Sequence, residues 1–406
     1  MELANAQREK HSAFYTNKFI VQEIFTQLPD LKGDTISIIE PSVGAGNFLP
    51  FIFKKYAHKQ QINLTVIDID PKTIELLQIL YSNDKIPANC KIYFVFADFM
   101  EYNYSKVDLI IGNPPFSKIN GAYRTKLLTQ NYNQESTNLA EFFLNKALKT
   151  ANYVSLVLPK NILNTPEFYA TRQLLATYSV DCILDFGEQG FKNVLVETIN
   201  LMINPKKKST QTKVISLTHN REILQQSSYI FADYLPYWII YRNEFFDQVF
   251  NKMQFGVFDV FRDRQITNSN TSINKSAKYQ IRVLKSRNIL DTSDITNIDG
   301  YDAYIDAQTL STLAINKYLA DTNVYLTPNM TYKPRLIKKN GHYVVNGSIA
   351  ILIPKVQDLN FSQVQLDYIA SEEFREFYKI ARNYQTRSLN VDKTSCYWFG
   401  KNLALA

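Results

Sequence analysis

The residues with the most evident chemistry lie in VDLIIGNPPF, residues 107–116, where an apolar run ends in an asparagine and two prolines. Ligands of open α/β sheets bind beyond the carboxyl ends of strands, so we expect Asn113 at an active-site edge. Proline has a fixed φ and no N–H group, so Pro114 offers only its carbonyl oxygen beside the amide oxygen of Asn113. Two acceptors at a fixed spacing suit an exocyclic amine, and they would stabilise positive charge that develops on its nitrogen during group transfer. Phe116 is expected to stack on the ring that carries the amine, although an ordinary double-proline turn explains the tetrapeptide equally well.

A glycine-containing segment, IIEPSVGAGNFL at residues 38–49, forms another strand-to-helix junction. Gly44 and Gly46 allow close approach of the backbone to a ligand. Glu40, followed by Pro41, ends the strand, where its carboxylate suits an ammonium group and repels a pyrophosphate. The third glycine of the dinucleotide fingerprint is missing, so the glycines alone are a weak signal.

Two more acids end the next two predicted strands, Asp68 in VIDIDP and Asp98 in FADF. Each acid taken alone is explained by helix capping or by a solvated loop. Together with Glu40, they match a ligand that has an amino group, a ribose diol and an adenine amine, which describes S-adenosylmethionine. Asp98 would accept a hydrogen bond from the adenine amine, and Phe99 would lie against the adenine ring.

The elements that must position these residues alternate along the first 205 residues as apolar runs and amphipathic helical patterns, which predicts an α/β sheet. Continuous apolar runs are typical of strands buried on both faces. The predicted strands are 35–40, 64–69, 92–97, 108–113, 153–159, 181–186 and 197–203. The predicted helices are 17–28 with Thr16 or Asn17 as N-cap, one that begins at Pro71, 138–150 and 166–178. No long helical pattern separates the last two strands, so we expect an antiparallel hairpin at the sheet edge.

The composition indicates a globular chain, since 45% of its 406 residues are hydrophobic and 20% are charged. The polar stretch that begins near residue 205 marks a change of pattern, and we predict one domain at 1–225 and a second at 240–406.

No apolar run is long enough to span a bilayer, and the polar first twelve residues predict no secretory signal. Three widely separated cysteines predict a reducing cytoplasm, and neither they nor the four histidines have the spacing of metal ligands, so we expect no metal.

The second half of the chain interleaves basic residues with Tyr, Asn and Gln in LKSRNI (284–289), TYKPRLIKK (331–339) and ARNYQTRSLN (381–390). Basic side chains hold phosphates, whereas arginines and amides read base edges. The net charge of +7 favours a polyanionic partner, although solvated basic surface explains any single residue better. The candidate DNA contacts are Lys285, Arg287, Lys333, Arg335, Lys338, Arg382 and Arg387. Aromatic residues make up 13% of the chain, which suits core packing or base stacking.

In its order of motifs the chain resembles the gamma group of DNA adenine-N6 methyltransferases, of the TaqI type. The resemblance covers about residues 11–204 and rests on FYTNKFIVQEIF, EPSVGAGNFL, VIDIDP, ADF, NPPF and LPKNIL. It implies a Rossmann-like S-adenosylmethionine-dependent methyltransferase fold with a seven-stranded sheet, followed by a C-terminal α+β DNA-recognition domain.

The resemblance also implies roles for individual residues. Tyr15, Thr16 and Glu40 would contact the methionine end of the cofactor, Asp68 its ribose, and Asp98 with Phe99 its adenine. Asn113 and Pro114 would hold the target amine, and Phe116 and Phe191 would stack on the extruded base. The family more often has Tyr at the position of Phe116, and glutamate is common at the position of Asp68, whose shorter side chain has less reach to the ribose.

The sequence therefore predicts site-specific transfer of a methyl group to the N6 amine of an adenine flipped out of duplex DNA. We expect a cytoplasmic monomer or weak dimer, with a separate cognate restriction endonuclease as a further partner.

Guanine-N2 methyltransferases of ribosomal RNA and glutamine methyltransferases of release factors share the tetrapeptide, but they usually carry their extra domain before the glycine segment. DNA cytosine-N4 transfer and a non-catalytic DNA-specificity subunit stay open as alternatives. A fused nuclease is excluded, since no Glu-x-Lys tripeptide occurs and neither Asp-x-Lys segment has a suitable partner acid.

Overall fold

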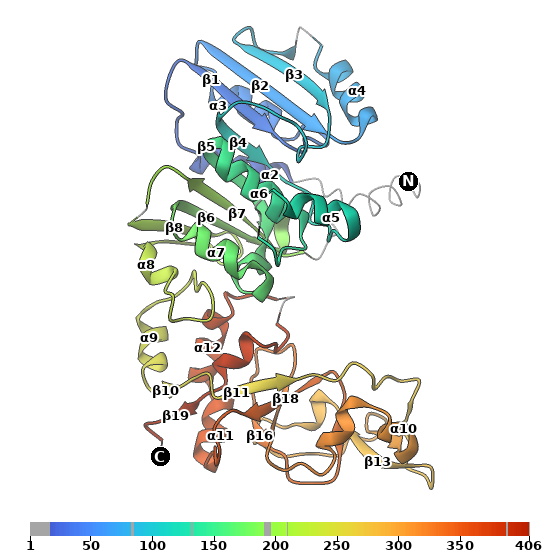
Figure 1. Ribbon diagram of the computed structural model, residues 1–406. Coiled ribbons are helices and arrows are strands. Elements are labelled where there is room, and N and C mark those ends of the chain that lie inside the picture. The colour runs from blue at the N-terminus through green and yellow to red at the C-terminus, as the bar shows by residue number, and fades with distance from the viewer. Residues whose placement is uncertain are drawn as a thin grey trace. The chain divides into compact units, whose positions relative to one another are not determined.

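The computed structural model describes residues 17–82, 85–130, 133–190, 196–208, 210–386 and 389–405 (Figure 1). The chain divides into two compact units, Met1–Trp238 and Ile239–Ala406. The division falls inside the interval left between the two predicted domains. Among the described helices, none is long and apolar enough to cross a membrane.

The first unit is built on one nine-stranded sheet with the order β3-β2-β1-β4-β5-β7-β6-β8-β9. β7 runs antiparallel to both β5 and β6, and β9 runs antiparallel to β8, whereas the other neighbours are parallel. The strands are β1 (Thr35–Glu40), β2 (Gln61–Asp68), β3 (Cys90–Phe96), β4 (Val107–Gly112), β5 (Ala151–Pro159), β6 (Ser179–Gly187), β7 (Thr198–Asn204), β8 (Gln211–Ser216) and β9 (Arg221–Gln226).

All seven predicted strands are present, and the predicted hairpin of β6 and β7 is confirmed. Its predicted place at the sheet edge is wrong, because β8 and β9 extend the sheet beyond β6. The polar, basic stretch that begins near residue 205 lies between β7 and β8, within the first unit. Neither β8 nor β9 was predicted. The edge strand β9 has only exposed and half-buried residues, so it lacks the continuous apolar run that indicated the seven predicted strands.

Helices cover both faces of this sheet. The helices α2 (Lys18–Gln27), α3 (Leu49–Lys55) and α4 (Pro71–Leu80) share one hydrophobic core with alternate residues of the central strands. Residues of the same strands that point the other way, such as Ile110 and Leu156, are also fully buried, and α6 (Leu139–Thr150) packs on β5. The remaining helical segments are α5 (Gly121–Leu128), η2 (Lys160–Leu163), η3 (Pro166–Phe168), α7 (Tyr169–Leu175), η4 (Glu188–Gly190) and α8 (Ser227–Ile230).

Two of the predicted helix starts are built as expected. Asn17 caps α2, since its side chain accepts a hydrogen bond from the N–H of Phe19. Pro71 occupies the first turn of α4, and the side chain of Asp70 caps that helix by accepting from the N–H of Lys72.

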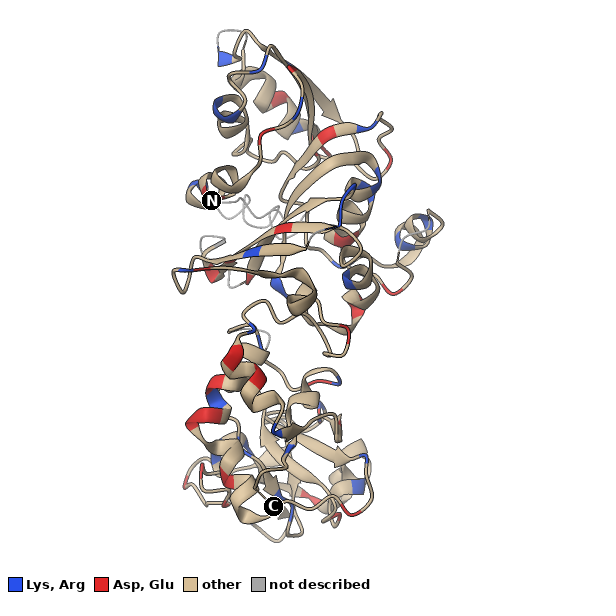
Figure 2. Cartoon of the chain, turned by 90° about the vertical axis from the view of Figure 1, so that its left-hand side faces the viewer, with Lys and Arg blue, Asp and Glu red and all other residues tan. Residues whose placement is uncertain are grey.

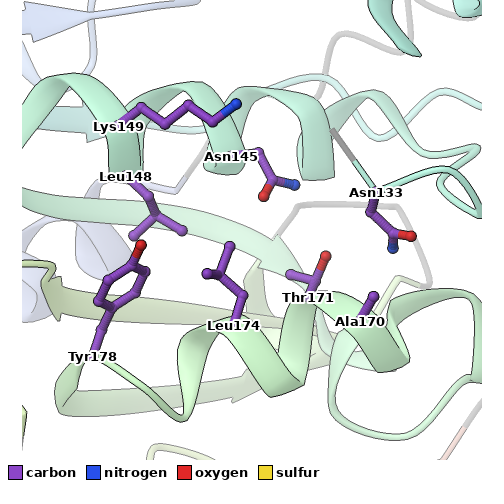
Figure 3. Close-up of a pocket in the computed structure, with 8 residues that line it drawn as sticks. All are labelled: Asn133, Asn145, Leu148, Lys149, Ala170, Thr171, Leu174 and Tyr178. Carbon is purple, nitrogen blue, oxygen red and sulfur yellow. The ribbon is translucent and has the colours of Figure 1, made fainter. Parts of the chain in front are cut away.

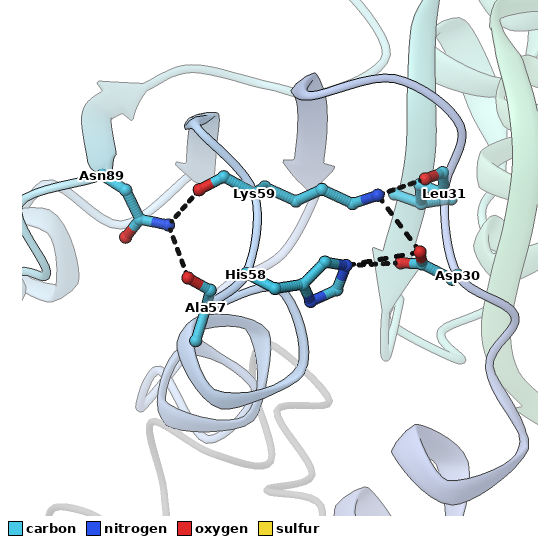
Figure 4. A network of polar contacts seen from close by, with 6 residues as sticks. All are labelled: Asp30, Leu31, Ala57, His58, Lys59 and Asn89. Atoms are coloured by element: carbon cyan, nitrogen blue, oxygen red, sulfur yellow. Dashed lines mark hydrogen bonds and ion pairs between the residues drawn. The ribbon is translucent and has the colours of Figure 1, made fainter.

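A polar network fixes the amino ends of β1, β2 and β3 (Figure 4). The ammonium of Lys59, which lies just before β2, donates to the carboxylate of Asp30 at 3.2 Å. Asn89, just before β3, donates its side-chain N–H to the carbonyl oxygen of Lys59 at 2.9 Å. These contacts tie together the segments that precede the three strands, whose carboxyl ends lie at the opposite edge of the sheet.

The second unit is an α+β structure, in agreement with the predicted architecture. Its sheets have the orders β11-β18-β15-β16, β12-β14-β13-β17 and β10-β19. The strands are β10 (Met253–Gln254), β11 (Phe258–Phe261), β12 (Thr271–Ser272), β13 (Tyr279–Leu284), β14 (Ala303–Asp306), β15 (Tyr325–Pro328), β16 (Ile337–Lys338), β17 (Val344–Val345), β18 (Ile349–Pro354) and β19 (Lys401–Asn402). The helical segments are α9 (Glu244–Phe250), η5 (Ser286–Asn288), α10 (Ala307–Ser311), η6 (Ala314–Tyr318), α11 (Gln363–Ala370), α12 (Glu372–Ala381) and η7 (Ser395–Trp398).

From the spacing of its apolar residues, the segment 363–380 is expected to form one helix, but it forms two, α11 and α12. Ser371 separates them, since its backbone is extended and its hydroxyl accepts from the N–H of Phe374. Many aromatic residues of this unit serve its core. Phe246 and Phe377 stack at 4.8 Å between ring centroids, and both contact the fully buried Trp398.

Three buried ionisable side chains join the carboxyl ends of β5 and β6 to the start of β7. The ammonium of Lys160 lies 2.7 Å from a carboxylate oxygen of Asp185 and 3.8 Å from one of Glu197. These side chains are 2%, 0% and 4% exposed, so the ammonium is the cation that offsets two buried carboxylates.

Lys160→Met is expected to lower the free energy of unfolding by roughly 3–5 kcal/mol, because it leaves buried carboxylates without that cation. The matched control is Lys126→Met, which breaks an ion pair with Glu101 whose side chains are 55% and 50% exposed. We expect the free energy of unfolding of the control to change by about 1 kcal/mol or less. Urea denaturation followed by circular dichroism measures both, and equal losses in the two variants would contradict the buried cluster.

Candidate active site

The carboxyl edge of the first sheet brings the predicted site residues together. Glu40 ends β1, Asp68 ends the neighbouring β2, and Asn113 directly follows β4 on the other side of β1. Asp98 follows β3, the next strand outward, by two residues. Because these four strands are parallel neighbours, their ends meet at one edge, where ligands of such sheets bind.

The glycine turn after β1 is held by Asp68. Gly44 has a φ of +52° and Gly46 a φ of +72°, a conformation that favours glycine. The N–H of Gly44 donates to the carboxylate of Asp68 at 2.9 Å. Burial raises the pKa of Asp68, and the charge of Asp70 acts in the same direction, while hydrogen bonds from backbone N–H groups oppose the shift. Asp68 therefore shapes the backbone that a ligand would approach.

Glu40 is a buried carboxyl group with an unsatisfied oxygen. Its side chain belongs to a residue only 1% exposed, and within the described residues its Oε2 has no hydrogen-bond partner. Burial, together with the charge of Asp68, raises the pKa of Glu40 well above its usual range. A cation placed beside this oxygen would remove the penalty for ionisation, so the site fits a ligand that carries an ammonium group.

The corner after β4 is packed closely against the glycine turn. A Cβ atom on Gly112 would lie 3.2 Å from Cδ of Pro41 and 3.5 Å from Cγ of Glu40, so only glycine fits there without displacement. Ser42 donates its hydroxyl to the carbonyl oxygen of Asn113 at 2.9 Å. The strand ends of Glu40 and Asn113 are thereby brought within contact range of each other.

The other residues of the corner are also anchored. Pro114 is buried, and Phe116 is half-buried and packs against the core beneath the site. Asn138, the cap of α6, donates its side-chain N–H to the carbonyl oxygen of Phe116 at 3.3 Å. Ser42 and Asn138 were not among the predicted site residues, because only the folded chain brings them to this corner.

Asp98 and Phe99 are neighbours in the chain but have different surroundings. The carboxylate of Asp98 accepts from the N–H of Met100 and from the hydroxyl of Tyr123 in α5, each at 2.8 Å. The prediction that Phe99 lies against a cofactor ring is wrong for this structure. Phe99 is 2% exposed, and its ring packs at 4.8 Å on Phe143 with the ammonium of Lys146 at 4.9 Å. Its aromatic faces therefore serve the core.

Two exposed apolar residues at the same edge were missed by the sequence analysis. Ile69, which directly follows Asp68, is 62% exposed, and Phe96 at the end of β3 is 61% exposed. In the sequence, each of them could have been recognised as an apolar residue at the end of a predicted strand, close to an acidic residue. Such a surface suits a flat aromatic ring whose polar edge faces the neighbouring carboxylates.

Four of the predicted site residues, Tyr15, Thr16, Phe191 and Arg387, lie outside the described residues. In the part of the chain that the structure describes, no group of three or more His, Cys, Asp or Glu side chains could hold a metal ion.

The candidate DNA contacts of the second unit have unlike surroundings. Lys333, Lys338 and Arg287 are exposed, and Lys285 is half-buried. Arg335 forms an ion pair with Asp291 at 2.8 Å. Lys and Arg residues occur along the chain in both units (Figure 2).

The prediction that Arg382 contacts DNA is wrong. Arg382 is 1% exposed, and its guanidinium donates to the hydroxyl of Tyr378 at 2.9 Å and to the carbonyl oxygens of Leu389 and Asn390 at 3.3 Å each. The guanidinium therefore links α12 to the segment that follows it, and it has no access to a phosphate.

A cavity of about 330 Å³ lies between α6 and α7, away from the predicted residues (Figure 3). Its polar lining includes Asn133, Asn145 and Thr171. Asn133 and Thr171 donate to the buried carboxylate of Glu141, whose pKa burial raises. The polar lining is thus engaged in supporting α6, and none of the predicted site residues contributes to it.

Comparison with known proteins places these features in context. The family model described as Eco57I restriction-modification methylase matches residues 55–191. The Type II methyltransferase M.CvrRI of Paramecium bursaria Chlorella virus XZ-6E is 27% identical over 183 residues, 45% of this chain and 44% of that protein. The Type II methyltransferase M.VspI of Vibrio sp. (strain 343) is 24% identical over 228 residues, 54% of each chain. The chain thus matches about half the length of these relatives.

The fold also resembles a solved structure, that of the Type IIL restriction-modification enzyme MmeI in complex with DNA. The TM-score is 0.50 at 12% identity, over 87% of this chain and 60% of that one. The predicted resemblance to restriction-modification methylases is confirmed, as is the Rossmann-like methyltransferase sheet. The gamma group and the TaqI type stay predictions.

Proposed function

We propose that this chain is an S-adenosylmethionine-dependent DNA methyltransferase that modifies the N6 amine of an adenine flipped out of duplex DNA. The observation that carries the proposal is the contact at Gly112, which joins the corner of Asn113 and Pro114 to the buried carboxyl of Glu40. One ligand beside Glu40 and another at the corner would be close enough to react. The similarity to restriction-modification methylases supports DNA as the substrate.

The cofactor half of the site consists of Glu40, Asp68 and Asp98, with backbone from Pro41 to Gly46. Glu40 would pair with the amino group of the methionine moiety, and Asp68 would accept from the ribose hydroxyls. Asp98 would accept from the adenine amine with its remaining lone pairs, and Ile69 would cover a face of the adenine ring. Tyr15 and Thr16 are proposed to contact the methionine end.

The target half consists of Asn113, Pro114 and Phe116, with Phe191 as a proposed second stacking residue. The cofactor, when bound, supplies an electrophilic methyl group on a sulfonium. The side-chain oxygen of Asn113 and the carbonyl oxygen of Pro114 accept the two hydrogens of the amine, which directs its lone pair toward the methyl group. The same oxygens stabilise the cationic amine, which then loses a proton to water.

The second unit is proposed to bind duplex DNA with Lys285, Arg287, Lys333, Arg335 and Lys338, and Arg387 belongs to the same proposal. Flipping the adenine costs a few kcal/mol in lost stacking and pairing, which stacking in the pocket would offset. We further propose a cytoplasmic enzyme, monomeric or weakly dimeric, that acts beside a separate restriction endonuclease of the same specificity.

A direct test of the reaction is transfer of tritiated methyl groups from S-adenosylmethionine to duplex DNA, followed by nucleoside analysis. We expect the label in N6-methyladenine. Label in N4-methylcytosine, in guanine of RNA or in protein would support one of the alternative substrates instead. Cofactor binding without any transfer would support a non-catalytic specificity subunit.

Asn113→Ala is expected to reduce kcat by at least about 100-fold, as removal of one preorganised hydrogen-bonding group does in other enzymes. Cofactor affinity should stay within a few-fold of the unaltered protein, because the amide acts on the target amine. Asn161→Ala, which alters the segment after the neighbouring strand β5, is the matched control. Loss of cofactor binding in Asn113→Ala, measured by calorimetry, would contradict the assigned role.

Cofactor affinity is expected to rise with pH over the range in which Glu40 ionises. The pKa of Glu40 is raised in the free protein, chiefly by burial, and a bound ammonium group stabilises the ionised form and lowers this pKa. Binding therefore releases a proton, and affinity increases up to the raised pKa as long as the ligand amine stays charged, below about pH 7.5.

Glu40→Gln should remove this pH dependence and weaken binding by about tenfold or more, as expected for loss of a charge-assisted hydrogen bond. The control is Glu75→Gln on the exposed side of α4, which should change neither the cofactor affinity nor its pH dependence. Calorimetry in buffers with different ionisation enthalpies measures affinity and proton release together. An affinity that falls with rising pH in the unaltered protein would overturn the role of Glu40.

A further inference from the structure

The turn that follows β13 in the second unit holds two cations against one aromatic ring. The ammonium of Lys285 lies 4.0 Å, and the guanidinium carbon of Arg287 4.8 Å, from the ring centroid of Tyr301. In the described part of the chain, neither side chain forms an ion pair with an acid. The two charges are closer together than the screening length of about 10 Å at 0.1 M salt, so their fields reinforce each other.

The backbone of this turn is rigidly built. Asn288, at 0% exposure, accepts from the N–H of Lys285 at 2.9 Å and donates to the carboxylate of Asp302 at 2.6 Å. The N–H of Ser286 donates to the hydroxyl of Ser348 at 2.9 Å. The turn is therefore fixed by its own Asn288 and by two other parts of the chain, at Asp302 and Ser348, and Lys285 and Arg287 project from a preformed support.

Two other basic residues of the same unit are already engaged. Arg335 is neutralised by Asp291 and also donates to the carbonyl oxygen of Ser286 at 3.5 Å, so it supports the same turn. Arg382 is buried, as described above. Lys285 and Arg287 thus combine unneutralised charge with a fixed support.

The geometry points to a base-reading element, and we propose that Arg287 recognises a guanine in the major groove of the substrate DNA. A guanidinium whose carbon lies over an aromatic ring keeps its N–H edge available, and that edge matches the O6 and N7 acceptors of guanine. Lys285 would bind a neighbouring acceptor, and Tyr301 is a positioning residue that holds both. This inference rests on the proposed function and adds that the recognition sequence contains a guanine read by Arg287.

The test begins with the full chain expressed in a host without DNA methylation, where methylome sequencing defines the recognition sequence. Methylation of duplexes that carry each single-base substitution of this sequence is then measured for the unaltered protein and for Arg287→Ala. We expect kcat/KM on the unaltered site to fall roughly 10- to 100-fold. We also expect discrimination at one guanine position to disappear, while the other positions stay specific.

Companion variants separate positioning from folding. Tyr301→Leu should relax specificity at the same guanine. Tyr301→Phe retains the ring and should therefore keep the specificity of the unaltered protein. Lys333→Ala, an exposed lysine of the same unit, should weaken methylation of all sequences alike, as expected for a phosphate contact. Lys206→Ala, in the turn from β7 to β8, should leave activity and specificity unchanged.

Two outcomes would overturn the inference. A uniform loss on all duplexes in Arg287→Ala would identify a phosphate contact, and unchanged specificity would remove Arg287 from recognition. In both outcomes the unaltered protein still methylates DNA, so the proposed function stands. Absence of DNA methylation by the unaltered protein, with cofactor binding intact, would reject the proposed function itself.

Discussion

Burial of the Glu40 carboxyl group without a cationic partner in the described chain is the constraint on which the site depends. A carboxyl group in such surroundings is stable as the neutral acid or beside a cation, so the end of β1 would favour a positively charged ligand. The missing side chain of Gly112 brings the next strand end into contact with this position. Under the proposed function, the cofactor half and the target half of the site are therefore parts of a single packing arrangement.

The sequence predicts most of the first unit, because most of its central strands are buried on both faces and appear as continuous apolar runs. The prediction fails where burial is partial, as for β9, whose alternating exposure resembles a loop. It also fails where a local hydrogen bond decides the structure, since the hydroxyl of Ser371 divides an otherwise continuous helical pattern into α11 and α12. Neither failure changes the order of the first seven strands along the chain.

The site was predictable to the extent that it consists of residues at strand ends. The roles of Phe99 and Arg382 were not, because an aromatic residue after an acid and an arginine in a basic segment have the same sequence signal whether exposed or buried. The ring of Phe99 packs on Phe143, which belongs to α6, and the guanidinium of Arg382 donates to Tyr378, which lies four residues earlier in α12. Ser42, Asn138 and Tyr123 were missed because their contacts depend on folding, which brings them to the corner and to Asp98.

The reversed direction of β7 has a consequence for how such a protein can diversify. Since β6 and β7 are antiparallel, the chain that joins Gly187 to Thr198 begins and ends at the edge that carries Asn113. Under the proposed function, insertions or deletions in this connection would change the surroundings of the target base without moving the strands that carry Glu40 and Asp68. The ammonium of Lys160, which lies beside Asp185 and Glu197, would keep the two ends of the connection in place.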